Sequence, residues 1–350
     1  MNSLSSIFIF RNVLLALVIT LLLGWISIPL ARRFGLMDFP GSAPHKKHET
    51  ATPLAGGVVL LLTLLLCEWY SGLLEHPFLN ATFLSVLPVF FIGLWDDFRS
   101  LSPPVKLVGQ IAAAILLIRQ GIYIRVFESP EFFIYGSSQI FVWLDWFLTI
   151  VWLVGITNAF NLVDSMDGLA VGLGGLAAAF FMLVTIDAYQ TNLAQHSALI
   201  IGVCIGLYLF NSPPAMLFLG DAGAQTLGFI LGVLAIAYNP IEANQASSWI
   251  VPVLLLGVPI FDTCLVIYSR WRGKRPITRA GRDHTYHRLL SKGVASQRAV
   301  LLMHTGGLIL GSLAVLILKQ PPLFANTVFG LVCITGVWLI IKLEKGEEKV

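Results

Sequence analysis

Acidic, amide and histidine side chains gather in four short clusters, each beside an apolar stretch of the chain. The clusters are Asp96-Asp97, Asn158/Asn161/Asp164/Asp167, Gly220-Asp221-Ala222-Gly223 and Arg282-Asp283-His284-x-x-His287. Carboxylate oxygens suit hard divalent cations, and Mg²⁺ commonly completes its coordination with substrate phosphates. Carboxylates gathered at one face of a membrane therefore predict a metal-dependent site that handles phosphate and is reached from both water and lipid.

The Asp96-Asp97 pair ends an apolar stretch in the segment GLWDDFRSLSPPVK. Two carboxylates at a helix C-terminus oppose the helix dipole, which favours cations there. That cost indicates a role with a metal or with a proton to be removed. The alternative is a solvated cap of the loop that enters Pro103-Pro104.

The Asn/Asp series recurs every three residues from Asn158 to Asp167. On an α-helix four such residues sweep half of the circumference, so a loop or a 3₁₀ turn would align them better. Asn and Asp also suit caps and turns, but the regular spacing favours a site.

Asp221 can likewise cap the helix that follows it, while its flanking glycines would let the backbone approach a phosphate at a helix N-terminus.

His284 and His287 lie three residues apart in a basic segment. A zinc site needs further ligands at defined spacing, and the sequence offers none. We therefore expect phosphate contacts, the alternative being an interfacial loop with incidental histidines.

Asp262 lies inside an apolar stretch beside Gly257 and Pro259, and an acid in such a place is a candidate functional residue.

The segments that must position these clusters consist mostly of hydrophobic residues. Of the 350 residues, 57% are hydrophobic and 12% are charged, whereas soluble domains carry about 25% charged residues. A membrane span needs roughly 20 mostly apolar residues. Eleven stretches qualify, and they leave no room for a soluble domain: 10–31, 55–74, 78–95, 105–125, 141–160, 168–187, 196–211, 224–239, 249–269, 299–318 and 324–342. We predict one all-α polytopic membrane domain over residues 1–350.

Lys and Arg mark the cytoplasmic side of a membrane protein. Of the 22 Lys and Arg residues, 18 fall on one side if the eleven spans alternate. This predicts an external N-terminus, a cytoplasmic C-terminus and a cytoplasmic site. The loops on that side, which carry all four clusters, are 32–54, 96–104, 161–167, 212–223 and 270–298. The basic loop 270–298 is short and tied to spans at both ends, so we expect it to face lipid and not nucleic acid.

Six segments in order resemble the polyprenyl-phosphate N-acetylhexosamine-1-phosphate transferases, glycosyltransferase family 4 of the WecA/MraY type. They are GLMDFP…HKKH…TPLAGG, GLWDDFRSLSPPVKLVGQ, NAFNLVDSMDGLA, FNSPPAMLFLGDAG, VPIFDT and GRDHTYHRL. The eleven spans and the histidine segment resemble the WecA-like branch more closely. The resemblance implies that undecaprenyl phosphate attacks a UDP-N-acetylhexosamine, with GlcNAc as the default sugar, in the bacterial cytoplasmic membrane. UMP would leave, and the lipid-linked sugar would initiate a cell-envelope glycan.

The resemblance also implies Mg²⁺ or Mn²⁺ and a role for each cluster. Asp221 resembles the main metal ligand, and Asp96 or Asp97 the group that deprotonates or orients the lipid phosphate. Asn158, Asn161, Asp164 and Asp167 resemble metal-site and nucleotide contacts, Asn211 and Phe218 uridine contacts, and Arg282, His284 and His287 diphosphate or sugar contacts. Basic positions at Lys46, His48 and Lys106 would help to bind phosphates. A homodimer is left open.

Two features leave alternatives open. Tyr286 stands where the family often has another histidine, which leaves the donor sugar undecided. The rival function is an ion-coupled transporter, a class that places acids near the bilayer midplane and often shows inverted repeats. Only Asp262 fits that pattern, because the other clustered acids lie at span ends and no repeat is visible.

Overall fold

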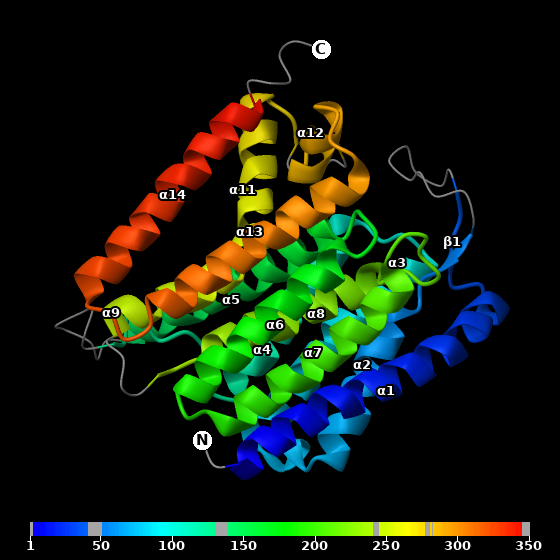
Figure 1. Cartoon of the computed structure of the whole chain (residues 1–350), viewed down its shortest axis with the longest axis horizontal. Coiled ribbons are helices and arrows are strands. Elements are labelled where there is room, and N and C mark those ends of the chain that lie inside the picture. Colours follow the sequence, from blue (N-terminus) through cyan, green and yellow to red (C-terminus); the bar gives the residue numbers. More distant parts are fainter. Residues whose placement is uncertain are drawn as a thin grey trace.

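The computed structural model describes residues 3–40, 51–129, 139–240, 245–276, 281 and 283–344, and the chain in these ranges is almost entirely helical (Figure 1). The long helices are α1 (Ser3–Phe34), α2 (Gly56–Tyr70), α3 (Pro77–Phe98), α4 (Pro103–Arg119), α5 (Gln139–Val163), α6 (Leu169–Asp187), α7 (Thr191–Asn211), α8 (Gly220–Ala237), α11 (Gly257–Arg272), α13 (Ser296–Leu316) and α14 (Pro322–Glu344). Shorter elements are β1 (Met37–Asp38), β2 (Thr52–Pro53), η1 (Leu73–Glu75), α9 (Gln245–Ser248), α10 (Ile250–Leu255) and α12 (Thr285–Ser291).

Eight of the described helices are long and apolar enough to cross a membrane: α1, α3, α5, α6, α7, α8, α13 and α14. A helix in hydrocarbon satisfies its own backbone polar groups, which explains why these apolar stretches fold as helices. The other three predicted spans coincide with α2, with α4 and with the α10–α11 pair. The prediction of an all-α polytopic membrane protein is confirmed. The count of eleven and the orientation stay predictions.

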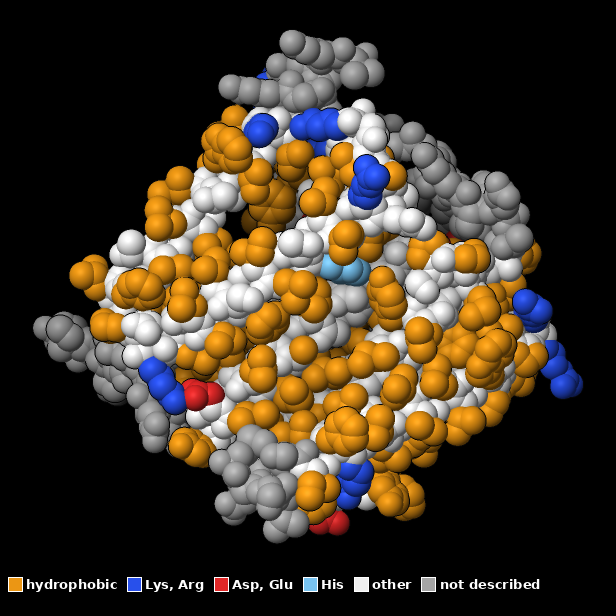
Figure 2. Space-filling view, viewed as in Figure 1, with side chains coloured by type: hydrophobic (Ala, Val, Ile, Leu, Met, Phe, Trp, Pro, Cys, Tyr) orange, Lys and Arg blue, Asp and Glu red, His pale blue; other side chains and the backbone are white. Residues whose placement is uncertain are grey.

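Helix α8 forms the centre of the bundle. It packs against α2, α3, α5 and α6, and nearly all of its residues are buried. The outer helix α14 buries little of its apolar surface, and Figure 1 shows it at the edge of the bundle. Figure 2 shows hydrophobic side chains over most of the visible face, with the charged groups near its margins. This distribution matches a protein surrounded by lipid chains.

Glycines let two helices approach the start of α8 closely. A Cβ atom on Gly57 of α2 would lie 2.4 Å from the backbone nitrogen of Gly223, and one on Gly93 of α3 would lie 2.6 Å from Cα of Ala222. Neither position can hold a larger residue without moving backbone. Small residues are the usual means of close helix contact in membranes, and here they fix where α8 begins.

Several predicted boundaries shift by a few residues, for local reasons. The stretch 105–125 is helical only to Arg119, because Gly121 takes a left-handed conformation with φ of 82°. The chain beyond it is held by Asp145, which accepts backbone hydrogen bonds from Val126, Phe127 and Glu128 at 2.9–3.1 Å. The stretch 249–269 is two helices, α10 and α11, divided at Leu256.

The first predicted cytoplasmic loop returns to the bundle through a small sheet. β1 and β2 pair antiparallel, with Met37 opposite Pro53. The carbonyl of Pro53 then accepts a hydrogen bond from the backbone of Phe218 (2.8 Å), and the carbonyl of Phe218 accepts one from Gly56 (3.0 Å). The loop before α8 is thereby attached to the start of α2. Lys46 and His48 lie outside the described residues.

Candidate active site

Asp97 anchors the beginning of α8. Its two carboxylate oxygens accept the backbone N–H groups of Asp221 (2.7 Å) and Ala222 (3.0 Å). Gly220 enters the helix with φ of 72°, and a Cβ atom there would lie 2.7 Å from the Asp97 carboxylate. The unpaired N–H groups and the dipole of a helix N-terminus favour a negative charge. Asp97 therefore lies at the C-terminus of one helix but is stabilised by the N-terminus of another.

Lys106 joins the other two carboxylates of this site. Its Nζ lies 2.7 Å from Oδ2 of Asp96 and also forms a short ion pair with Oδ2 of Asp221. Asp96 is further held by the backbone N–H of Leu101, at 2.6 Å from Oδ1. Residues from α3, α4 and α8 thus place two carboxylate oxygens around one ammonium group.

Asp164 and Asp167 lie in the turn between α5 and α6. Asp164 is close enough to Asp221 for the two carboxyl groups to interact electrostatically. Burial, together with the negative charges of Asp221 and Asp167, raises the pKa of Asp164 to about 8. Burial penalises the charged form of a carboxyl group, and like charges add to that effect. This turn therefore adds acidic groups near the two carboxylates that pair with Lys106.

The regular Asn/Asp series is divided between two kinds of structure. Asn158 and Asn161 lie on the last turns of α5, whereas Asp164 and Asp167 follow the helix end. Asn158 donates to Oε1 of Gln110 (2.7 Å) and to the carbonyl of Val154 (2.8 Å). Gln110 in turn donates to Gln225 of α8 at 2.9 Å. Asn158 therefore belongs to a buried amide network that joins α4, α5 and α8.

Asn211 and Phe218 lie at the two ends of the loop that precedes α8. Asn211 accepts the backbone N–H of Gly168 (2.9 Å) and donates to the carbonyl of Leu217 (3.1 Å). It therefore ties the Asp164–Asp167 turn to this loop. Phe218 uses its backbone to hold the start of α2, and its side chain is half-buried. The predicted uridine contacts of both residues stay predictions.

The histidine cluster lies at the start of α12 and contacts α11. Nδ1 of His284 lies 2.8 Å from Oδ2 of Asp262 on α11, and Nε2 of His287 lies 2.5 Å from the hydroxyl of Tyr286. The short helix α12, which carries His287, packs against α13. Arg282 lies outside the described residues.

Two buried residues near the site were not predicted from the sequence. Gln110 and Gln225 are fully buried and connect the helices behind the carboxylates. Their signal was a glutamine inside each of two otherwise apolar spans, since such a group needs a partner in hydrocarbon. The partner of Asp262 was also missed, because His284 is 22 residues away along the chain.

The carboxylates fit a Mg²⁺ ion whose coordination is completed by the substrate, and they do not form a complete metal site of their own within the described residues. Within the described ranges no group of three or more His, Cys, Asp or Glu side chains is arranged to hold a metal by itself. Mg²⁺ is usually held by one or two carboxylates together with substrate phosphates. Asp96 and Asp221 already share one cationic group, the ammonium of Lys106. Their oxygens are the hard donors that the ion prefers.

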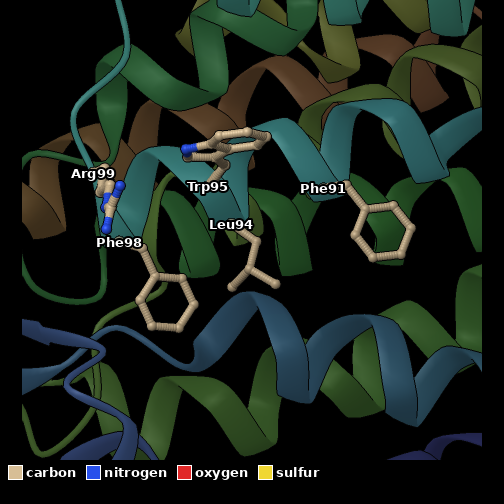
Figure 3. Close-up of a pocket in the computed structure, with 5 residues that line it drawn as sticks. All are labelled: Phe91, Leu94, Trp95, Phe98 and Arg99. Atoms are coloured by element: carbon tan, nitrogen blue, oxygen red, sulfur yellow. The ribbon is translucent and has the colours of Figure 1, made fainter.

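A shallow apolar groove follows the exposed side of α3 towards these carboxylates. Its volume is about 370 Å³, and it is lined by Phe91, Leu94, Trp95, Phe98 and Arg99. Figure 3 shows Arg99 at one end of the row and Phe91 at the other. Aromatic residues and a cation at a helix end are typical of the membrane interface. The aspartate pair is thus adjacent to a lipid-facing surface.

The chain is similar to known proteins over most of its length. The family model described as Glycosyl transferase family 4 matches residues 79–239, which include Asp96, Asp97, Lys106, Asp164 and Asp221. A probable undecaprenyl-phosphate N-acetylglucosaminyl 1-phosphate transferase of Bacillus subtilis is 29% identical over 90% of this chain and 87% of its own. A phospho-N-acetylmuramoyl-pentapeptide-transferase of Halalkalibacterium halodurans is 31% identical over 87% of this chain and 95% of its own.

A third relative, the decaprenyl-phosphate N-acetylglucosaminephosphotransferase of Mycobacterium tuberculosis, is 28% identical over 91% of this chain and 85% of its own. All three similarities extend over nearly the whole chain, well beyond the matched segment. They confirm the resemblance that the six motifs indicate, and they decide against a transporter. The chain belongs to glycosyl transferase family 4, a superfamily of polyprenyl-phosphate sugar-1-phosphate transferases, and is a phospho-sugar transferase.

Proposed function

We propose that this enzyme transfers GlcNAc-1-phosphate from UDP-GlcNAc to undecaprenyl phosphate, releasing UMP. The product would initiate cell-envelope glycan synthesis. The observation that carries the proposal is the shared position of Lys106 between Asp96 and Asp221, beside the N-terminus of α8. The relatives of Bacillus subtilis and Mycobacterium tuberculosis bear names that include N-acetylglucosamine and a polyprenyl phosphate, which supports this donor and this kind of acceptor.

Mg²⁺ is the proposed cofactor, with Mn²⁺ as its substitute. Asp221 would be its main ligand, and Asp96, which shares the Lys106 ammonium with Asp221, would supply the second carboxylate. When bound, the ion would neutralise diphosphate charge and stabilise the departing UMP. Lys106 would then be released from its two carboxylates and become available to a phosphate oxygen.

The protein's own groups supply position and charge. Phosphoryl transfer requires aligned reactants and balanced charge more than covalent help from the protein. Asp97 fixes the first turn of α8, whose N-terminus favours anions. An oxygen of the lipid phosphate would attack the β-phosphorus, and the bond from that phosphorus to the UMP oxygen would break. Asp96, beside Lys106, is placed to orient the attacking phosphate or to remove its proton.

The site has to admit one substrate from water and the other from lipid. Its carboxylates lie at helix ends, and the apolar groove of α3 adjoins the same end of that helix (Figure 3). The bias of Lys and Arg supports a site that faces the cytoplasm. The acceptor phosphate would then enter from the inner leaflet while the nucleotide enters from solution.

The direct test is UMP release by the purified enzyme with undecaprenyl phosphate, Mg²⁺ and a panel of UDP-N-acetylhexosamines. We expect release that requires the lipid and is fastest with UDP-GlcNAc. Faster release with another hexosamine would correct the donor, and no release with any of them would refute the proposal. Incubation with labelled UDP-sugar alone separates the mechanisms, because only a two-step route would release UMP and leave the sugar phosphate covalently attached to the enzyme.

A further inference from the structure

The aspartate within α11 has no place in the proposed chemistry, yet it is completely buried. Asp262 accepts the backbone N–H of Thr285 at 2.7 Å through Oδ1 and lies 2.8 Å from Nδ1 of His284 through Oδ2. Burying a carboxylate is costly unless its oxygens are paired. Each oxygen of Asp262 has a partner, and both partners belong to the histidine cluster.

This contact distinguishes the two nitrogens of the His284 ring. An ionised carboxylate can only accept hydrogen bonds, so the proton between the two groups belongs to Nδ1. Nε2 is then the nitrogen left for a ligand. The second partner of a histidine commonly fixes its tautomer and ring orientation in this way.

The segments on either side of His284 are also held firmly. Arg288, which is 1% exposed, donates to the carbonyl of Asp283 at 3.0 Å and pairs with Glu344 of α14 at 2.8 Å. The carboxylate of Asp283 pairs with Arg270 of α11 at 3.1 Å. The backbone before and after His284 is therefore fixed. The ring itself stacks on Tyr286, with 5.9 Å between centroids, and Asp262 holds its Nδ1.

We infer that Asp262 is a positioning residue, which holds His284 as the Nδ1–H tautomer and directs Nε2 towards the diphosphate of the sugar nucleotide. The inference rests on the proposed function for the identity of that ligand. A purely structural carboxylate could cap α12 with one oxygen alone. The second oxygen, committed to a side chain of the histidine cluster, is what distinguishes positioning from capping.

The first test examines the ring without turnover. In protein with ¹⁵N-labelled histidine, H284Q identifies the His284 signals among those of the seven histidines. We expect a protonated Nδ1 in the wild type. In D262N the side-chain oxygen can keep the Thr285 bond while the amide nitrogen faces Nδ1, so the proton should move to Nε2. An unprotonated Nδ1 or a mixture of tautomers in the wild type would overturn the inference.

The second test uses turnover with a matched control. Asp145 is equally buried within a helix and also accepts backbone N–H groups, but at the opposite end of the bundle. We expect D262N to lower kcat by about 10- to 100-fold, as loss of an orienting partner commonly does, and D145N to keep kcat within about twofold. Wild-type kcat in D262N would refute the positioning role. No turnover by the wild type would instead refute the proposed function and the diphosphate ligand. The tautomer of His284 measured in the first test would still show whether Asp262 positions the ring.

Discussion

The acidic side chains at the two ends of the bundle have different kinds of partner. At one end, Asp145 near the start of α5 accepts three backbone N–H groups, and Glu68 of α2 pairs with His196 of α7 at 2.7 Å. At the other end, Asp96 and Asp221 share a single lysine, and a proton-retaining Asp164 lies nearby.

The difference lies in which groups pair with each carboxylate. Groups held in place by the fold pair with Asp145 and Glu68, so a substrate has no partner to displace there. A long, flexible lysine balances Asp96 and Asp221, and it can be exchanged for a metal ion with its phosphates. Asp145 and Glu68 are thus satisfied within the fold, whereas Asp96 and Asp221 rely on an exchangeable lysine, so that their charge stays available to substrates.

The largest expected effect comes from removing the charge at Asp221. Asp221→Asn should lower kcat by at least about 1000-fold, comparable with the loss of a central electrostatic group in other enzymes. The fold should persist, since the backbone N–H of residue 221, not its side chain, meets Asp97. UMP release and thermal unfolding in detergent measure the two effects.

Asp145→Asn is the matched comparison at the other end. It should reduce thermal stability, because an amide offers one acceptor to three backbone donors, and turnover should stay near normal. Equal loss of turnover in both variants would erase the proposed distinction between the two ends.

Asp97 tests whether the site depends on a fixed helix start. In Asp97→Asn one backbone N–H of α8 faces an amide nitrogen, which should cost about 1–3 kcal/mol of stability. We expect kcat to fall about 100-fold as well, since a displacement near 1 Å can have that effect. Turnover and unfolding are both measured. Loss of stability with undiminished kcat would show that Asp97 serves folding alone.

The pKa of Asp164 predicts a pH-dependent affinity for Mg²⁺. Below its raised pKa of about 8 the carboxyl group is mostly neutral and attracts the ion less. The affinity should therefore increase as the pH rises towards 8, by up to about tenfold per pH unit if one proton is released. Titration calorimetry in two buffers measures both affinity and proton release. The same pH dependence in Asp164→Asn would exclude Asp164 as its origin.

The sequence was sufficient to predict the helical membrane fold, and the chemistry predicted for the site stays a prediction. Length and hydropathy predict helices because only internally bonded backbone is stable in hydrocarbon. The charge of Asp96, Asp164 and Asp221 predicts a polar site because isolated acids at span ends need a reason to persist. The Asp97 pattern was harder to interpret, since its stabilising partner is the N-terminus of α8, more than a hundred residues away.

The remaining features depend on contacts that spacing does not encode. The three-residue period of the Asn/Asp series favoured a loop or a 3₁₀ turn that would align all four side chains. Instead, α5 ends within the series, so that Asn158 joins an amide network while Asp164 enters the turn. Similarly, the resemblance implies a uridine contact for Asn211 but gives no sign that its amide ties together two loops. An amide can serve ligand or backbone equally, and only the fold decides which it meets.

The smallest effect should come from Phe218, which tests a contact outside the carboxylate group. Its backbone, not its ring, attaches the loop to Pro53 and Gly56, so Phe218→Leu should keep the fold. If the ring stacks on uridine, its loss should cost about 1 kcal/mol and raise KM for the UDP-sugar about fivefold, with KM for the lipid unchanged. Met216→Leu, on the same loop, should change neither constant. A rise in KM for the lipid alone would place Phe218 on the acceptor side and confine nucleotide recognition to other groups.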